Sequence, residues 1–115
     1  MLAQRFRFHG HGSLRYVYKN GDSIRSRLVT IKYVANKKRK NSRITVVVSK
    51  KVLKSAVGRN RIRRRLYEIV RRNMDKFEGV YDIALLVFSS EVATMEAADL
   101  ERTVLSQLKE ARIIK

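Results

Sequence analysis

The sequence has no cysteine, no long apolar run and only two acidic residues within positions 1–74. Without cysteine the chain can form neither a disulfide framework nor a thiolate metal site, which is compatible with a reducing compartment. No apolar run approaches the roughly 20 residues that a membrane helix needs. The N-terminal segment does not resemble a signal peptide, because Arg5 and Arg7 interrupt its apolar residues. These features predict a soluble protein of the cytoplasm.

The length of 115 residues, 44% of them hydrophobic, suits one compact core. We therefore predict a single domain over residues 1–115. Residues 1–12, in which glycines flank His9 and His11, form a segment that we expect to be flexible before a partner binds.

The basic charge of the chain is large and unevenly placed. There are 27 Lys and Arg against 10 Asp and Glu, which gives a net charge of +17. Residues 1–74 hold 22 of the basic residues, whereas residues 75–115 hold five basic and eight acidic ones. A basic excess in one part of a folded chain favours a polyanionic partner. A membrane surface is not expected to be that partner, since the basic segments lack the Trp-, Phe- and Leu-rich face of an interfacial helix.

A short helix is the first predicted element. Ser13 can cap its start, and Gly21 can end it. Leu14, Val17 and Tyr18 recur at helical spacing and would form its apolar face.

Two strands joined by a basic loop are predicted next. Leu28–Ala35 is rich in β-branched and aromatic residues, and Ile44–Ser49 alternates in a way that places Ile44, Val46 and Val48 on one face. The connecting segment Asn36–Ser42 contains four consecutive basic residues and is typical of an exposed turn. A β-hairpin made of these two strands is the arrangement that we expect.

The rest of the chain predicts a helix, a strand and a second helix. The first helix begins near Val57–Arg59, the strand is the apolar run Tyr81–Phe88, and the second helix spans about Thr94–Ala111. The order α-β-β-α-β-α predicts an α/β (α+β) two-layer sandwich with one small mixed sheet and three helices. The expected buried positions of the two helices are Ile62, Leu66, Ile69, Val70 and Phe77, and then Ala97, Leu100, Val104, Leu108 and Ala111.

Side chains that could catalyse a reaction are scarce. A protein nuclease needs a general acid and base, or carboxylates that gather divalent metal ions. His9 and His11 have no carboxylate near them in the sequence, and no glycine-rich phosphate loop precedes a helix. We therefore expect no catalytic residue, no metal site and no small-molecule substrate in this chain.

The densest signal is a run of basic residues between positions 50 and 72. It holds ten Lys and Arg against one acidic residue, Glu68. With the apolar stripe turned to the core, the arginines would form an exposed belt in which like charges repel each other. Because guanidinium groups suit phosphate oxygens, this belt predicts a nucleic-acid partner. On the expected helix Arg64 and Arg71 point outward, flanked by Arg59 and Arg63 on one side and by Arg61 and Arg65 on the other.

The same residues resemble the signature of the bacterial ribonuclease P protein family. That signature is a strand ending in S-K-K, then A-V-x-R-N-R and further basic residues. Here it is carried by Ser49-Lys50-Lys51, by Ala56-Val57 and by Arg59-Asn60-Arg61-Ile62-Arg63-Arg64. Arg5-Phe6, the helix at Leu14–Gly21 and the strand Tyr81–Val87 also look like family elements.

The sequence departs from the family pattern in four places. The spacer Val52–Ser55 is one residue longer than usual, and the His-Gly-His segment is not part of the pattern. Leu14 stands where an aromatic residue is common, and Tyr67 stands where arginine is common.

The resemblance implies both a fold and a role. The fold is an α/β sandwich whose β-α-β crossover around the arginine-rich helix is left-handed. The role is that of the protein subunit of a ribonucleoprotein whose RNA, using Mg²⁺, removes the 5′ leader from precursor tRNA, so the protein alone is expected to be inactive. The residues implied to contact the catalytic RNA are Ser49, Lys50, Lys51, Arg59, Asn60, Arg61, Arg63 and Arg64. The residues implied to contact the leader are Arg15, Tyr18, Lys32 and Val46.

Three other interpretations compete with this one. A basic ribosomal protein would share RNA binding but would lack affinity for precursor tRNA. A helix-turn-helix DNA-binding protein is disfavoured, because an alternating strand and not a helix precedes the basic helix. A ribonuclease that acts without RNA is disfavoured by the missing acid–base set.

Overall fold

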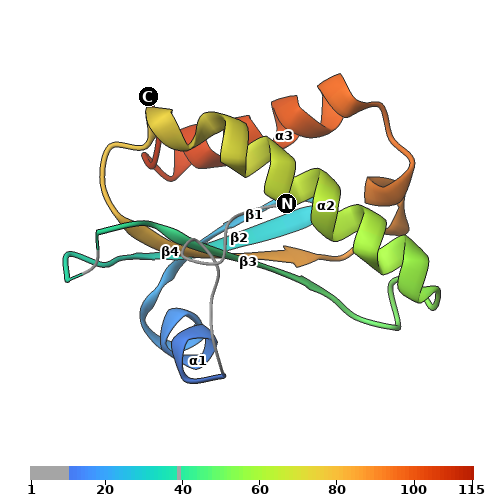
Figure 1. Ribbon diagram of the computed structural model, residues 1–115, viewed down its shortest axis with the longest axis horizontal. Coiled ribbons are helices and arrows are strands. Elements are labelled where there is room, and N and C mark those ends of the chain that lie inside the picture. The colour runs from blue at the N-terminus through green and yellow to red at the C-terminus, as the bar shows by residue number, and fades with distance from the viewer. Residues whose placement is uncertain (1–10, 39) are drawn as a thin grey trace.

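The computed structural model describes residues 11–38 and 40–115 and confirms the predicted fold class, with three helices and one four-stranded mixed sheet (Figure 1). The helices are α1 (His11–Asn20), α2 (Ala56–Asn73) and α3 (Ala97–Glu110). The strands are β1 (Asp22–Arg25), β2 (Val29–Ala35), β3 (Arg43–Val48) and β4 (Tyr81–Val87). Two short 3₁₀ helices, η2 (Met74–Lys76) and η3 (Ser90–Ala93), follow α2 and β4.

The strand order is β1-β2-β4-β3, so the predicted hairpin of β2 and β3 is wrong. β4 lies between these strands, antiparallel to β2 and parallel to β3. The physical reason is that β4 has the longest apolar run and gains most from being covered on both faces. β3 and β4 are therefore joined through α2 as a β-α-β unit.

The structure adds β1, which the sequence did not predict. β1 is four residues long and contains a single apolar residue, Ile24, so it has no alternation to recognise. It is held as an edge strand by antiparallel pairing with β2, in which Ile24 stands opposite Ile31.

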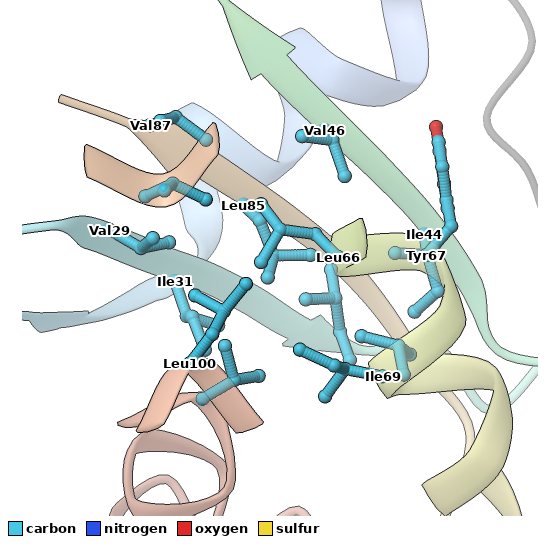
Figure 2. Packing of buried hydrophobic residues seen from close by; sticks show 14 of the residues in the cluster. Val29, Ile31, Ile44, Val46, Leu66, Tyr67, Ile69, Leu85, Val87 and Leu100 are labelled. Carbon is cyan, nitrogen blue, oxygen red and sulfur yellow. The ribbon is translucent and has the colours of Figure 1, made fainter. Parts of the chain in front are cut away.

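One face of the sheet carries the hydrophobic core. α2 and α3 both cover this face, which we call the core face (Figure 1). Alternate residues of β2, β3 and β4 point toward α2 and α3, as Figure 2 shows for Ile31, Ile44 and Leu85. Of the stripe predicted for the basic helix, Ile62 and Leu66 are fully buried and Ile69 is 4% exposed. The stripe therefore orients α2 as predicted.

The opposite face, which we call the second face, is covered by α1 and by no other helix of the described residues (Figure 1). α1 lies against β2 and β4, and its Val17 is fully buried there. Gly21 allows the close approach, because a Cβ atom at this position would lie 2.6 Å from the carbonyl oxygens of Tyr33 and Val17. Within the described part of the chain, the second face is therefore less covered by helices than the core face.

Helix boundaries differ from the predictions at two N-termini. α1 begins at His11, so Ser13 lies within the helix and not at its predicted N-cap position. α3 begins only at Ala97, because η3 first turns the chain. The Ser89 hydroxyl caps the start of η3 by accepting a hydrogen bond from the Glu91 N–H. Ala97 therefore sits in the first turn of α3 and is exposed, not buried as predicted. α2 begins at Ala56, close to its predicted start.

Candidate nucleic-acid interface

The turn after β3 presents the first predicted contact residues. The Ser49 carbonyl accepts hydrogen bonds from the backbone N–H groups of Val52 (3.1 Å) and Leu53 (3.4 Å), which closes the turn. Ser49, Lys50 and Lys51 are all exposed on it. The turn leads directly into α2, so these residues and the start of α2 lie at the same end of the sheet (Figure 1).

The start of α2 is fixed by a cap and by an arginine. The Ser55 hydroxyl accepts a hydrogen bond from the Gly58 N–H at 3.1 Å. The Arg59 Nη1 donates to the carbonyls of Leu53 (2.9 Å) and Lys54 (2.7 Å). Arg59 therefore braces the longer spacer, while its Nε and Nη2 groups can still donate to a phosphate.

Beyond Arg59, the first half of α2 presents arginines without acidic partners. The Arg63 Nη1 donates to the Asn60 side-chain oxygen at 2.9 Å, which orients both groups on the helix surface. Arg61 and Arg64 are exposed, and within the described part of the chain no acidic side chain pairs with them. We use the name cationic patch for the eight predicted residues that the structure brings to this end: Ser49, Lys50, Lys51, Arg59, Asn60, Arg61, Arg63 and Arg64.

The remaining arginines of α2 are used within the protein. Arg65 donates to the carbonyls of Val92, at 2.8 Å, and Met95, and so ties α2 to the segment before α3. Its pKa is lowered, first by burial and then by the nearby charge of Arg61. Arg65 belonged to the predicted belt, and the structure shows that its guanidinium group is half-buried and already bonded.

Two ion pairs occupy the end of α2. Arg71 is hydrogen-bonded to Glu68, which lowers the pKa of the Glu68 carboxyl. Arg72 lies 3.2 Å from the Glu101 carboxylate on α3. Arg71 is exposed and points outward as predicted, but it is paired with Glu68, so the unpaired part of the belt ends at Arg64.

On the second face, the structure brings together Tyr18 and Lys32, two of the four predicted leader contacts. The Lys32 Nζ lies 5.7 Å from the centroid of the Tyr18 ring, within the range of a cation–π interaction. Tyr18 is 42% exposed, and partial burial raises the pKa of its hydroxyl. Arg15, on the same helix, is exposed. An exposed aromatic ring can stack on a nucleic-acid base, and the cation beside the ring can neutralise the phosphate of that nucleotide.

The fourth predicted leader contact, Val46, is wrong. Val46 is 5% exposed and points into the core beneath α2, on the face of the sheet opposite α1 (Figure 2). The alternation of β3 places Ile44, Val46 and Val48 on one face, but it does not tell which face of the sheet α1 covers. The neighbours of Val46 on the second face are Thr45 and Val47, both half-buried. Sequence reasoning missed these two residues.

The described residues offer no metal centre. Within residues 11–38 and 40–115 no three His, Asp or Glu side chains cluster in a way that could hold a metal ion. The most buried carboxylate, Asp82, is bonded to Arg43 and Asn36, and Glu91 is paired with Arg27. Carboxylates that are already paired in this way do not suit Mg²⁺. This ion is usually held by one or two carboxylates and keeps several of its water molecules. His9 lies outside the described residues, as do Arg5 and Phe6.

The helices of the described chain are also too short or too polar to cross a bilayer. α2 has the length of a short membrane helix at 18 residues, but arginine recurs throughout it.

Comparisons with known proteins agree with the geometry. The family model for ribonuclease P matches residues 2–112. The ribonuclease P protein component of Clostridioides difficile is 37% identical over 102 residues, covering 86% of this chain and 85% of that protein. That of Clostridium kluyveri is 37% identical over 114 residues, covering 96% and 97%.

Solved structures show the same fold. The RNase P protein of Staphylococcus aureus superposes with a TM-score of 0.84 at 24% identity, covering 96% of this chain and 98% of that one. The RNase P protein of Thermotoga maritima superposes with a TM-score of 0.80 at 24% identity, covering 90% and 96%. Sequence and fold together place the chain in the ribonuclease P protein component family, the protein part of a tRNA-processing ribonucleoprotein.

Proposed function

We propose that this protein is the RNA-binding subunit of a ribonuclease P in which the RNA cleaves the 5′ leader from precursor tRNA. The observation that carries the proposal is the cationic patch, whose arginines Arg61 and Arg64 are exposed and have no acidic partner within the described chain. Four basic side chains on two turns of helix repel one another unless a polyanion lies against them. The family membership identifies that polyanion as RNA.

The patch suits the backbone of a folded RNA. Guanidinium groups donate paired hydrogen bonds to phosphate oxygens, and the lysines of the turn add mobile charges beside them. Binding would release the counterions condensed on the RNA and lower the repulsion between the catalytic RNA and its substrate. Mg²⁺ would act within the RNA, since no three His, Asp or Glu side chains of the described residues cluster in a way that could hold a metal ion.

A second surface would hold the single-stranded leader. Tyr18 and Lys32 form a stacking and charge-neutralising pair on the second face, and Arg15 lies exposed on the same helix as Tyr18. Base stacking on an aromatic ring is tolerant of sequence, which suits leaders that differ from one precursor tRNA to another. On β3, Thr45 and Val47 lie on the second face, so they and not Val46 would face the leader.

Reconstitution tests the proposal. The protein is combined with a bacterial ribonuclease P RNA, and precursor-tRNA cleavage is measured at low Mg²⁺ with and without protein. We expect cleavage at low Mg²⁺ only when both components are present, and none from the protein alone after all RNA has been removed. Cleavage by RNA-free protein would overturn the assignment of catalysis to RNA.

The same experiment separates the main alternative. A ribosomal protein of similar charge would bind the RNA but would not distinguish precursor from mature tRNA. We therefore expect the reconstituted complex to bind precursor tRNA more tightly than mature tRNA, and equal binding would favour the ribosomal interpretation.

A further inference from the structure

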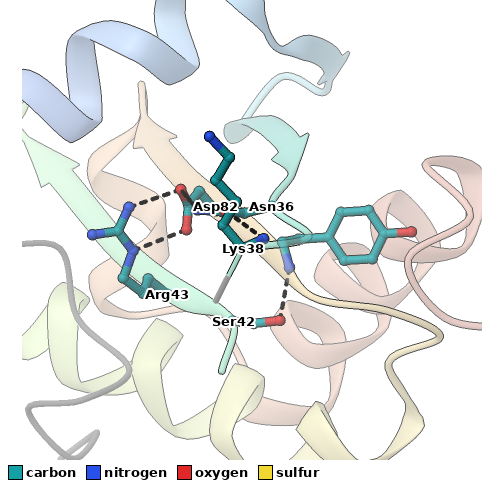
Figure 3. Close-up of polar contacts among 6 residues, drawn as sticks. Asn36, Lys38, Ser42, Arg43 and Asp82 are labelled. Carbon is teal, nitrogen blue, oxygen red and sulfur yellow. Dashed lines mark hydrogen bonds and ion pairs between the residues drawn. The ribbon is translucent and has the colours of Figure 1, made fainter. Parts of the chain in front are cut away.

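The basic loop between β2 and β3 is fastened to the start of β4 at both ends (Figure 3). On the β2 side, the Asn36 N–H donates to the Val80 carbonyl at 2.8 Å, and its Nδ2 donates to the Asp82 carboxylate at 2.9 Å. On the β3 side, the Ser42 hydroxyl accepts from the Tyr81 N–H at 2.9 Å. The two ends of the loop, at Asn36 and at Ser42, are thus both held by the sheet.

A buried ion pair completes this attachment. The Arg43 Nε and Nη2 donate to the two oxygens of Asp82 at 3.0 and 2.8 Å, and the two side chains are only 9% and 3% exposed. The residues are Cα partners on the parallel strands β3 and β4, so the pair lies across the sheet. Breaking a buried pair leaves an uncompensated charge in the protein, which strongly disfavours any shift of the strands at this point.

The loop itself carries cations that the fold does not use. Lys37, Lys38 and Lys40 are exposed, and no acidic side chain of the described chain pairs with them. The Asn36 side-chain oxygen accepts from the Lys38 N–H at 3.3 Å, which orders the first turn of the loop. A run of like charges on an anchored turn has a cost from repulsion that an RNA phosphate backbone would offset.

The position of the loop relates it to the second face and not to the cationic patch. The cationic patch follows the end of β3, whereas the loop precedes its start, so the two lie at opposite ends of the sheet (Figure 1). The second-face residue Lys32 lies three residues before the end of β2 at Ala35, or about 10 Å along the strand, and Lys37 follows in the turn beyond it. That length of strand corresponds to about three stacked nucleotides.

We propose that Lys37, Lys38 and Lys40 form a second phosphate-binding element, which holds the part of the precursor-tRNA leader that extends past Tyr18 and Lys32. This inference rests on the proposed function. Asn36 is a positioning residue for the element, because it binds both Asp82 and the loop backbone. The ligand is recognised by its phosphodiester backbone. The affinity that the element adds would therefore depend on the length of the leader and not on its sequence.

The test compares leader lengths on reconstituted ribonucleoprotein. Lys37→Gln/Lys38→Gln/Lys40→Gln is set against a control of equal charge change, Lys76→Gln/Lys109→Gln/Lys115→Gln, whose lysines are also exposed. Dissociation constants are measured for precursor tRNAs with leaders of about two and about ten nucleotides, lengths chosen to end before and beyond the loop. Exposed ion pairs contribute up to about fivefold each, so the loop variant should bind the long-leader substrate about ten- to a hundredfold more weakly than the control does. It should bind the short-leader substrate as the control does.

Binding of the catalytic RNA alone, measured for both variants, distinguishes the two RNA sources. A loss that appears in this assay, or equally with both leader lengths, would show that the loop contacts the catalytic RNA or the tRNA body and would overturn the inference. Equal behaviour of loop and control variants would also overturn it. If the unsubstituted protein itself fails to support cleavage, the proposed function fails instead.

Asn36→Ala tests the positioning role without changing any charge. We expect a loss of about threefold or more in affinity for the long-leader substrate, with unchanged binding of the short-leader substrate, because a loosened loop must be ordered on binding. Asn36→Gln, which keeps an amide donor for Asp82 and an acceptor for the Lys38 N–H, should recover part of the loss. If Asn36→Ala binds both substrates as the unsubstituted protein does, Asn36 is not a positioning residue.

Discussion

Arginines are spread over both halves of α2, four in residues 56–64 and three in residues 65–73. In the second half, every arginine is bonded within the protein: Arg65 to backbone carbonyls before α3, Arg71 to Glu68 of α2 itself and Arg72 to Glu101 of α3. In the first half, Arg61 and Arg64 are exposed without an acidic partner in the described chain. The same residue type therefore stabilises the fold at one end of the helix and is available to RNA at the other.

The difference comes from what lies beside each half. α3 and the segment before it run along the second half of α2 and supply carboxylates and carbonyl oxygens, whereas the first half extends past them toward the turn after β3 (Figure 1). The acidic residues of positions 75–115 therefore do not neutralise the basic residues of α2 evenly. Glu101 neutralises only the part of α2 that α3 can reach.

The largest effect is expected from Ile62→Ala, which tests whether position along α2 or the face of the helix decides a residue's role. Ile62 lies in the first half between Arg61 and Arg63, but it is fully buried. Its truncation should leave a cavity that lowers the free energy of unfolding by about 2–5 kcal/mol. Denaturant titration measures this change. A loss below 1 kcal/mol would show that the first half of α2 is not packed on the sheet as described.

The next effect is on RNA binding. Arg61→Ala/Arg64→Ala should weaken binding of the catalytic RNA by about 1–3 kcal/mol for each contact that is lost, because the phosphates lose charged hydrogen-bond donors. Cleavage at low Mg²⁺ should fall together with the affinity for the catalytic RNA. It should recover as the Mg²⁺ concentration rises, since excess metal ions replace the missing screening charge. The free energy of unfolding should change by no more than about 0.5 kcal/mol, as is usual at an exposed surface.

Salt dependence sharpens the same comparison. If about six phosphates are engaged, the logarithm of the binding constant should fall against the logarithm of salt concentration with a slope of about −4 to −5. The double variant should be shallower by about 1.4 to 1.8, corresponding to two phosphates. The matched control is Arg71→Ala/Arg72→Ala in the second half, for which we expect the unsubstituted slope. A nearly flat dependence for the unsubstituted protein would argue against a phosphate-dominated interface.

Arg65→Ala should give the opposite result to the Arg61/Arg64 variant. The substitution removes the donors to the Val92 and Met95 carbonyls, and hydrogen bonds to charged groups contribute about 1.5–3 kcal/mol. The free energy of unfolding should therefore fall by about that amount, while RNA affinity per folded molecule stays within twofold. Thermal melts and RNA titrations on Arg65→Ala and Arg64→Ala, one residue apart, measure both quantities. If Arg65→Ala weakens RNA binding while leaving stability unchanged, the boundary between the two halves has been drawn in the wrong place.

These contrasts show which features the sequence could predict. The stripe Ile62, Leu66 and Ile69 oriented α2 correctly, because helical spacing is a local property. The residues of the S-K-K and R-N-R motifs lie close in sequence and on one connection, so the structure brings them to the same end of the sheet, and their contact with RNA stays a prediction. Tyr18 and Lys32 were predicted from the family resemblance, and the structure places them together.

What the sequence could not predict depends on contacts between distant segments. The hairpin of β2 and β3 was wrong because β4, more than thirty residues further along the chain, pairs with both strands. Val46 was assigned to the leader before it was known which face of the sheet α1 covers. The roles of Arg65 and Arg72 depend on where η3 and α3 lie, which no pattern within α2 reveals.

The smallest effect concerns pH and the second half of α2. The pKa of Glu101 is lowered, first by the hydrogen bond from Asn73 and then by Arg72. A carboxyl whose pKa is lower in the folded than in the unfolded state stabilises the fold above its ordinary pKa near 4.5, and this contribution is lost as the pH falls through the folded value. We therefore expect the free energy of unfolding to decrease as the pH is lowered from about 5 to 3, with Glu101 contributing about 0.5 kcal/mol, because the pair is partly exposed.

Glu101→Gln isolates this contribution, since glutamine can still accept from Asn73 but cannot titrate. Urea titrations between pH 7 and pH 3 should give a shallower pH dependence for Glu101→Gln than for the unsubstituted protein, while RNA affinity at neutral pH is unchanged. Arg72→Gln should flatten the profile only in part, because the hydrogen bond from Asn73 remains. A pH profile for Glu101→Gln that parallels the unsubstituted one would show that the contact of α3 with the end of α2 is not maintained in solution. The arginines of the second half would then be as available to RNA as those of the first.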